Sequence, residues 1–181
     1  MTAETQMTSD LNLRVRLALP SEGLTLRVAI VELHEEERRL HDSRLPGEQT
    51  ADAYLEWMLA EVARAGAVFV AEASGVFAGF AAGWIVEENF IEETPDSNRF
   101  GYISDVCVLP AFRGRRIAAR LLEALESRLS LSGVARIRLS ALVANQAARA
   151  AYERSGYTAF EIVYEKAVRD PGLLTAGSVA R

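Results

Sequence analysis

The sequence has one cysteine, two histidines and no long hydrophobic run. A single cysteine, Cys107, cannot form an intrachain disulfide, so nothing suggests a small secreted scaffold. His34 and His41 have no cysteine partner, which argues against a metal site. No apolar stretch approaches the roughly 20 residues that span a bilayer. Residues 1–10 lack the apolar core of a signal peptide. We therefore expect a cytoplasmic protein that uses no metal and no membrane.

Charge and composition narrow the class further. The 181 residues carry a net charge of −5, and an acidic chain is a poor partner for nucleic acid, which needs clustered Lys and Arg. Half of the residues are hydrophobic, which is enough for one packed core. We expect a disordered leader at 1–10, a single domain over 11–168 and a tail at 169–181.

Hydrophobic periodicity predicts strands and helices in alternation. Residues 11–19 alternate as in a half-buried strand, and residues 21–41 favour a helix capped by Ser21, although part of this stretch also fits a strand. Thr50 is the expected cap of a helix that Gly66 ends. A hairpin is expected at 67–73 and 76–86, further strands at 100–109, 135–143 and 157–168, a long helix before Gly133 and a short one at 145–155. Such an α/β or α+β order predicts a mixed sheet with helices on its faces.

The stretch 106–122 carries the most specific signal. A strand stops at Pro110, and a short basic loop then opens a long amphipathic helix. The first amides of a helix have no partner within it and lie at the positive end of its dipole, so they form an anion site that suits pyrophosphate. Small residues allow a close approach of the backbone, and three arginines add charge. The small residues are Gly114, Ala118 and Ala119, and the arginines are Arg113, Arg115 and Arg116. Taken alone, this loop could also be a solvated basic turn.

A second motif lies at 144–161. Asn145 is a natural amino-terminal cap and Gly156 a natural carboxyl-terminal cap of a short helix. Ala148 and Tyr152 share one face of that helix. By itself the motif would indicate only a capped helix with a packed tyrosine.

Together the two motifs resemble the GCN5-related N-acetyltransferase (GNAT) superfamily. Arg113 and Ala118 match its loop pattern Q/R-x-x-G-x-G/A, while Arg116 stands at the middle glycine. A non-glycine residue fits there if its backbone is helical and its side chain points outward. The resemblance covers roughly residues 66–166 and implies a mostly antiparallel sheet. The later family motif is matched by Asn145, Ala148, Tyr152, Gly156 and Tyr157.

The resemblance implies acetyl-coenzyme A as co-substrate. It predicts that the strands at 100–109 and 135–143 separate, so that the pantetheine arm pairs with exposed backbone between them. Asn145 should approach the pantetheine or cap the helix beside it. Backbone groups of Val106, Cys107 and Val108 should bind the pantetheine, and the amides of Arg113, Gly114, Arg115, Arg116, Ile117, Ala118 and Ala119 should bind the pyrophosphate.

The implied reaction is direct attack of an amine on the thioester, with Tyr152 as the acid that protonates the leaving thiolate. Asp105 could accept a proton through water, bind the ammonium, or be a paired structural carboxylate. Glu87 and Glu88 are rivals for the base. Strand alternation places Asp105 on the face of Ile103 and Cys107, opposite Tyr102, Ser104 and Val106. Cys107 is interpreted as a small core residue, because no histidine accompanies it in the motif.

Acidic residues indicate where the acceptor would bind. Glu88, Glu92, Glu93 and Asp96 in the 88–99 loop could form an acidic wall with residues 35–37, which would suit a cationic amine, or they could be ordinary solvated surface. The leading hypothesis is an N-acetyltransferase acting on a small-molecule amine. The alternatives are acetylation of a protein lysine or amino terminus, and a coenzyme A-binding module without turnover. A homodimer is plausible by analogy with the family.

Overall fold

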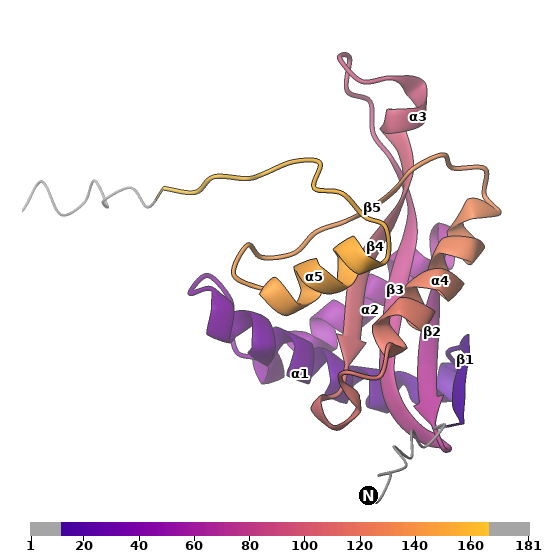
Figure 1. Ribbon diagram of the computed structural model, residues 1–181, viewed down its shortest axis with the longest axis vertical. Coiled ribbons are helices and arrows are strands. Elements are labelled where there is room, and N and C mark those ends of the chain that lie inside the picture. Colours follow the sequence, from indigo (N-terminus) through magenta and orange to yellow (C-terminus); the bar gives the residue numbers. More distant parts are fainter. Residues whose placement is uncertain (1–11, 167–181) are drawn as a thin grey trace, which may run out of the picture.

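A five-stranded sheet forms the centre of the molecule. The computed structural model describes residues 12–166, so the expected leader at 1–10 and tail at 169–181 lie outside the described residues. The strands lie side by side in chain order; the first three pairs are antiparallel and the last is parallel, which confirms a mixed, mostly antiparallel sheet (Figure 1). They are β1 (Leu13–Leu17), β2 (Gly66–Ala73), β3 (Val76–Glu87), β4 (Arg99–Val108) and β5 (Ile137–Leu139).

Helices cover both faces of this sheet, as expected. α1 (Gly23–Leu40) and α2 (Gly47–Ala65) pack on one face, and α4 (Ile117–Ser130) packs on the other with α5 (Gln146–Arg154) beside it (Figure 1). Three short helical turns complete the fold: η1 (Pro20–Glu22), α3 (Pro95–Asn98) and η2 (Pro110–Phe112). Among residues 12–166, no helix has both the length and the apolar character needed to cross a bilayer.

The apolar face of α4 holds it on the sheet. Its five expected core residues are all buried, and each contributes about 1.5–3 kcal/mol when removed from water. Gly133 follows the helix with a φ of 75°, the left-handed conformation that ends helices. The five residues are Ile117, Leu121, Leu122, Leu125 and Leu129.

The start of α2 differs from the prediction. The helix begins at Gly47, so Thr50 lies within its first turn and is not its cap. The Gly47 amide donates to the Glu35 carboxylate at 2.8 Å, which means that a side chain of α1 caps α2. The Thr50 hydroxyl instead lies 2.7 Å from the Nδ1 atom of His34.

The β2–β3 hairpin forms at the predicted turn. Ser74 and Gly75 have φ values of 52° and 80°, and two left-handed residues in a two-residue turn match the twist of antiparallel strands. The prediction of this hairpin is therefore confirmed.

A β-bulge in β4 changes which residues share a face. Asp105 lies opposite Ala82 while Ile103 lies opposite Gly83, so Ser104 is an extra residue. Ile103 packs in the core under α4, whereas Asp105 bonds to Tyr54 of α2. The prediction that Asp105 shares a face with Ile103 is wrong, because the extra residue in the bulge interrupts the alternation of side chains between the two faces.

The last two predicted strands are corrected by the structure. Only Ile137–Leu139 of the expected strand 135–143 pairs with β4, opposite Gly101–Ile103. The expected strand at 157–168 is not part of the sheet, since residues 157–166 have no regular secondary structure; residues 167–168 lie outside the described part. The short β4–β5 pairing means that these two strands separate beyond Ile103.

The bulge gives a first prediction. A Cβ atom added at Gly83 would lie 2.5 Å from the Tyr102 carbonyl oxygen and 3.2 Å from the Ile103 Cα atom, so the two strands would have to move apart. We expect Gly83→Ala to lower the free energy of unfolding by about 1–3 kcal/mol in urea denaturation. The control is Gly23→Ala, whose added Cβ meets nothing within 4 Å and whose φ is −52°. Equal stability of the two variants would contradict this account of the bulge.

Candidate active site

The edge of β4 beyond β5 carries unpaired backbone groups. The Leu109 amide donates to the Ala78 carbonyl of β3 at 2.9 Å. Backbone groups alternate in direction along a strand, so Cys107 also faces β3 while Val106 and Val108 face the open side. Val106 and Val108 therefore turn their backbone groups toward the open edge, and their binding of pantetheine stays a prediction. Cys107 does not, because its amide and carbonyl point toward the paired strand.

The loop between β4 and α4 presents free amides next to this edge. Gly114 and Arg116 have φ values of 77° and 60°, and Arg116 caps α4. The condition that the backbone at Arg116 be helical is not met: the residue is left-handed, which costs a non-glycine residue about 1–2 kcal/mol. Within residues 12–166, the amides of 114–119 donate to no backbone or side-chain acceptor. Ile117 is buried, so only its amide is available, whereas Ala118 and Ala119 are half-buried.

The arginines of this loop are only partly free. Arg113 donates through Nε to the Val108 carbonyl at 3.0 Å, and its guanidinium lies 3.6 Å from Glu32 and 3.4 Å from Glu36 of α1. Arg113 thus fixes the loop to α1 and occupies one carbonyl of the open edge. Arg115 lies over the Phe112 ring at 5.9 Å.

Tyr152 comes to this region from α5. The helix is capped as predicted, since the Asn145 side chain accepts from the Ala148 amide at 3.0 Å and Gly156 is left-handed with a φ of 92°. Burial raises the pKa of Tyr152 to about 12, and the negative charges of Asp105 and Glu37 add to this. The phenol therefore keeps its proton at neutral pH.

Asp105 is a buried carboxylate with two hydrogen-bond donors. It is 4% exposed and accepts from the Tyr54 hydroxyl at 2.8 Å and from the Ser104 hydroxyl. Burial raises the pKa of Asp105 to about 6, while the bonds from Ser104 and Tyr54 lower it. The group thus titrates close to neutral pH. Sequence reasoning missed both donors: Tyr54 looked like a core residue on the apolar face of its helix, and the bulge at Ser104 leaves no local signal.

Cys107 is a core residue, as interpreted from the sequence. It is 3% exposed, and its Sγ atom donates to the Ala29 carbonyl of α1 at 3.4 Å. Burial raises the pKa of Cys107 to about 12, so the side chain stays a thiol rather than a nucleophilic thiolate.

A row of aromatic rings extends from Asp105 across the α1–α2 face. The Tyr54 ring centroid lies 4.7 Å from that of His34 and 5.2 Å from that of Trp57. Trp57 in turn lies 5.3 Å from Trp84. Burial lowers the pKa of His34, which favours its neutral form. This packing holds the Tyr54 hydroxyl in place against Asp105.

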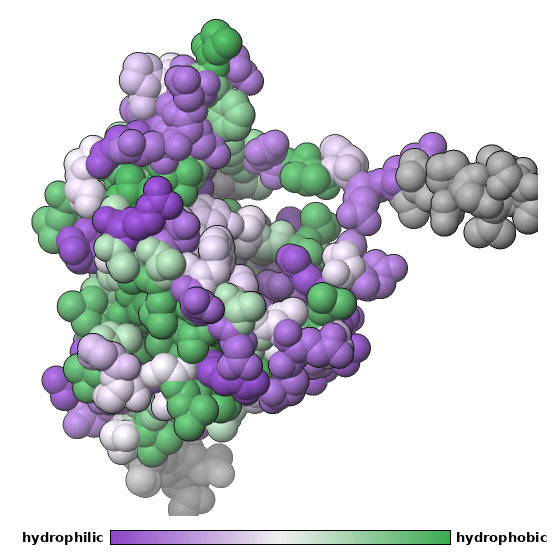
Figure 2. Space-filling view, turned by 180° about the vertical axis from the view of Figure 1, so that it is seen from behind, coloured by the Kyte–Doolittle hydropathy of each residue, from purple (hydrophilic) through white to green (hydrophobic). Residues whose placement is uncertain are grey.

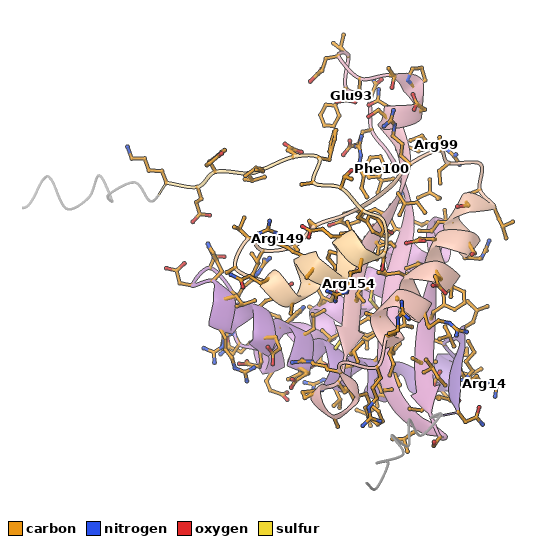
Figure 3. The ribbon with its side chains drawn as sticks, in the orientation of Figure 1. Arg14, Glu93, Arg99, Phe100, Arg149 and Arg154 are labelled. Carbon is orange, nitrogen blue, oxygen red and sulfur yellow. The ribbon has the colours of Figure 1, made fainter. Side chains whose placement is uncertain are left out.

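Arginines neutralise much of the expected acidic wall. In α1, Glu35 pairs with Arg38, Glu36 with Arg39 and Glu37 with Arg44. In the 88–99 loop, which projects from the sheet with Glu93 and Arg99 on it (Figure 3), Asp96 pairs with Arg136. An open hollow of about 420 Å³ remains at the base of this loop. Its lining residues are Glu87, Glu88, Asn89, Glu93, Pro95, Asn98 and Arg99.

The geometry of this region indicates the class of protein. Free helix amides suit a phosphate-containing ligand, an adjacent strand edge can hold an extended arm, and a phenol and a carboxylate offer proton transfer. The family model described as acetyltransferase (GNAT) family matches residues 28–157, so the chain belongs to this family and is an acetyltransferase. No curated protein matches the chain.

Solved structures share the fold at low sequence identity. The aminoglycoside N-acetyltransferase AAC(6')-Iy in complex with coenzyme A is 21% identical with a TM-score of 0.65, over 88% of this chain and 97% of that one. A GCN5-related N-acetyltransferase from Ralstonia eutropha is 18% identical with a TM-score of 0.68, over 86% and 98%. A predicted acetyltransferase from Clostridium acetobutylicum with acetyl-coenzyme A is 19% identical with a TM-score of 0.67, over 86% and 96%.

The buried carboxylate gives a second prediction. Because the pKa of Asp105 is about 6 in the folded protein against 3.8 ordinarily, the folded state keeps a proton that the unfolded state releases, and stability falls as pH rises through this range. Asp105→Asn removes this titration. We expect the free energy of unfolding of this variant, relative to that of the wild type, to be about 1 kcal/mol higher at about pH 8 than at about pH 5, measured by urea unfolding.

The control is Asp52→Asn on α2. Arg27 lowers the pKa of Asp52, so that carboxylate stays ionised at both pH values and its removal should have the same effect at each. If Asp105→Asn also showed no pH dependence, the elevated pKa of Asp105 would be wrong.

Proposed function

We propose that this acetyltransferase moves the acetyl group of acetyl-coenzyme A to a primary amine on a small cationic molecule by direct attack. The observation that carries the proposal is the open edge of β4, which continues directly into the free amides of 114–119. Support comes from similar folds whose structures contain coenzyme A or acetyl-coenzyme A, and from a neighbour named for acetylation of aminoglycosides.

The donor would lie along this edge. The amides of 114–119 would hold the pyrophosphate at the positive end of the α4 dipole. The amides of Val106 and Val108 would pair with the pantetheine arm as a further strand would. Asn145 would contribute little to donor binding through its side-chain oxygen, which already accepts from the Ala148 amide.

Proton transfer completes the proposed reaction. The amine nitrogen forms a bond to the thioester carbonyl carbon, and the carbon–sulfur bond breaks. Tyr152 gives its proton to the leaving sulfur, which a phenol with a pKa of about 12 can do at neutral pH. The ammonium loses a proton to a base, so the products are an N-acetylamine and free coenzyme A.

Asp105 is favoured over Glu87 and Glu88 as that base. Its negative charge contributes to the raised pKa of Tyr152, and its own pKa of about 6 suits a base at neutral pH. Both its oxygens already accept hydrogen bonds, so the proton would reach it through water. Glu87 is ion-paired with Arg99, and its side chain is 72% exposed, which keeps it an ordinary surface carboxylate.

A cationic acceptor is favoured by the remaining charges near the site. The Glu37 carboxylate, although ion-paired with Arg44, contributes to the raised pKa of both Asp105 and Tyr152. The hollow at the 88–99 loop contributes Glu88 and Glu93. A positively charged small molecule would be attracted to this side of the site.

The direct test is release of free thiol from acetyl-coenzyme A in the presence of a panel of small amines, including polyamines, amino acids and amino sugars. We expect acceptor-dependent thiol release with at least one cationic amine and none with neutral alcohols. Thiol release that no amine stimulates would contradict the proposal.

Tyr152→Phe tests the proposed acid. Loss of the proton donor should lower kcat by about 100-fold or more, while KM for acetyl-coenzyme A changes little. Tyr157→Phe is the matched control: its ring lies 6.2 Å from that of Tyr152 and its hydroxyl donates to Glu126 at 2.6 Å. This control should keep kcat close to wild type. A Tyr152→Phe enzyme as fast as the control would remove the acid role.

Gly114→Val tests the pyrophosphate loop. A β-branched residue at a φ of 77° carries strain of about 1–3 kcal/mol, so the loop should change shape and the dissociation constant for coenzyme A should rise about tenfold. Gly133→Val introduces the same strain at a φ of 75°, beyond the far end of α4 and about 20 Å away. Calorimetry should show weaker binding for Gly114→Val alone. Equal affinities in the two variants would contradict the assignment.

A further inference from the structure

Aromatic side chains continue from α2 across the sheet toward the open edge of β4. Trp57 of α2 meets Trp84 of β3 edge to face, with ring centroids 5.3 Å apart, and Trp84 lies 6.0 Å from Tyr102 of β4. The Tyr102 hydroxyl in turn lies 3.3 Å from the hydroxyl of Ser140, just after β5. Together Trp57, Trp84 and Tyr102 form an aromatic shelf.

The two ends of the aromatic shelf reach solvent. Trp57 is 46% exposed and Tyr102 is half-buried, whereas Trp84 between them is buried. Seen from behind, the side of the molecule that carries α1 and α2 exposes hydrophobic and weakly polar residues among hydrophilic ones (Figure 2). A tryptophan is seldom fully buried, so its exposure alone indicates no ligand. The position of the shelf is what gives it a role.

The aromatic shelf adjoins the groups proposed to react. Tyr54 lies one turn before Trp57 on α2, with the two ring centroids 5.2 Å apart, and its hydroxyl donates to Asp105 at 2.8 Å. Because of the bulge at Ser104, Tyr102 and Asp105 lie on the same face of β4, toward α2. Three residues of a strand span about 10 Å, so an amine that reaches Asp105 would carry its remaining atoms over the shelf.

Carboxylates close to the aromatic shelf are paired with arginines. Glu61 follows Trp57 by one turn of α2 and lies 3.4 Å from Arg64, and Glu37 of α1 lies 3.1 Å from Arg44. A polycation would have to compete with these arginines for the carboxylates. An apolar body can instead use the aromatic surface directly, because rings pack favourably against other rings and against alkyl groups. The surroundings therefore favour an acceptor with one charge and an apolar body.

We propose that the aromatic shelf binds the body of the acceptor, which is a primary amine attached to an aromatic or other apolar group rather than a polycation. Trp57 and Tyr102 are specificity residues: they contact the acceptor and take no part in bond breaking. The ammonium is directed toward Asp105, while the apolar body leaves water against the rings. The inference rests on the proposed acetyl transfer, whose acceptor it narrows.

Acceptor kinetics test the aromatic shelf in the wild-type enzyme. Phenethylamine and ethylamine carry the same charge at neutral pH and differ by one ring, and a good aromatic contact changes affinity about tenfold. We therefore expect KM for phenethylamine to be about tenfold lower than KM for ethylamine. We also expect kcat/KM for spermidine, a polycation, to be below that for phenethylamine. Equal KM values for the two monoamines, or a preference for spermidine, would overturn the proposal.

Trp57→Ala separates a specificity role from a structural one. KM for phenethylamine should rise about tenfold, while KM for ethylamine and kcat stay close to wild type. Trp57→Phe keeps a ring and should retain the preference for phenethylamine. The control is Leu59→Ala, on the same helix but another face, where a side chain that is 40% exposed is shortened with no effect on either KM. A Trp57→Ala enzyme that handles both amines equally poorly would contradict the specificity role.

Tryptophan fluorescence measures binding to the aromatic shelf without turnover. The chain has two tryptophans, and both lie in the shelf. Phenethylamine added in the presence of coenzyme A should change the emission, and Trp57→Phe should lose most of this change because Trp84 is only 5% exposed. A saturable change without any acetylation would contradict the proposed function and support the shelf. Acetylation of amines without any change in emission would contradict the shelf and leave the proposed function standing.

Discussion

The early end of the pairing between β4 and β5 is the constraint on which the site depends. The parallel ladder holds only Gly101–Ile103 against Ile137–Leu139. Backbone groups beyond it have no neighbouring strand, and buried groups of this kind require a partner. β4 then stops at Pro110, which cannot donate to a ladder, and α4 begins with free amides. A continuous stretch of chain thus provides both an edge for an extended arm and an anion site.

The features that local sequence controls were predictable. The apolar stripe of α4, the two-residue turn at Ser74 and the caps of α5 at Asn145 and Gly156 all follow from spacing and from residues with special backbone preferences. The loop proposed to bind pyrophosphate could be predicted because strand, proline, basic loop and helix follow one another directly in the chain.

Other features depend on contacts between distant residues. The bulge at Ser104 is a property of the register between two strands, so alternation along one of them misplaced Ile103. The cap of α2 comes from Glu35 in another helix, so the nearer Thr50 was a reasonable but wrong choice. The strand expected at 157–168 was wrong for residues 157–166, because an alternating apolar pattern becomes a strand only where a neighbouring strand pairs with it.

Fewer unpaired charged side chains surround the proposed site than the sequence indicated. Most acidic residues of α1 and Asp96 of the 88–99 loop are held by arginines, and Arg113 itself is tied to α1 and to Val108. What remains is a small set of groups with unusual surroundings: a buried carboxylate at Asp105, positioned by Tyr54, and the phenol of Tyr152. Burial, rather than the number of charges, raises the pKa values of both groups.

Amide hydrogen exchange with and without acetyl-coenzyme A tests the central claim most directly. The account predicts that the donor slows exchange at the Val106 and Val108 amides and at the amides of 114–119, while the amide of Cys107, already turned toward β3, is unchanged. Protection confined to other parts of the chain, with these amides exchanging as fast as before, would contradict it.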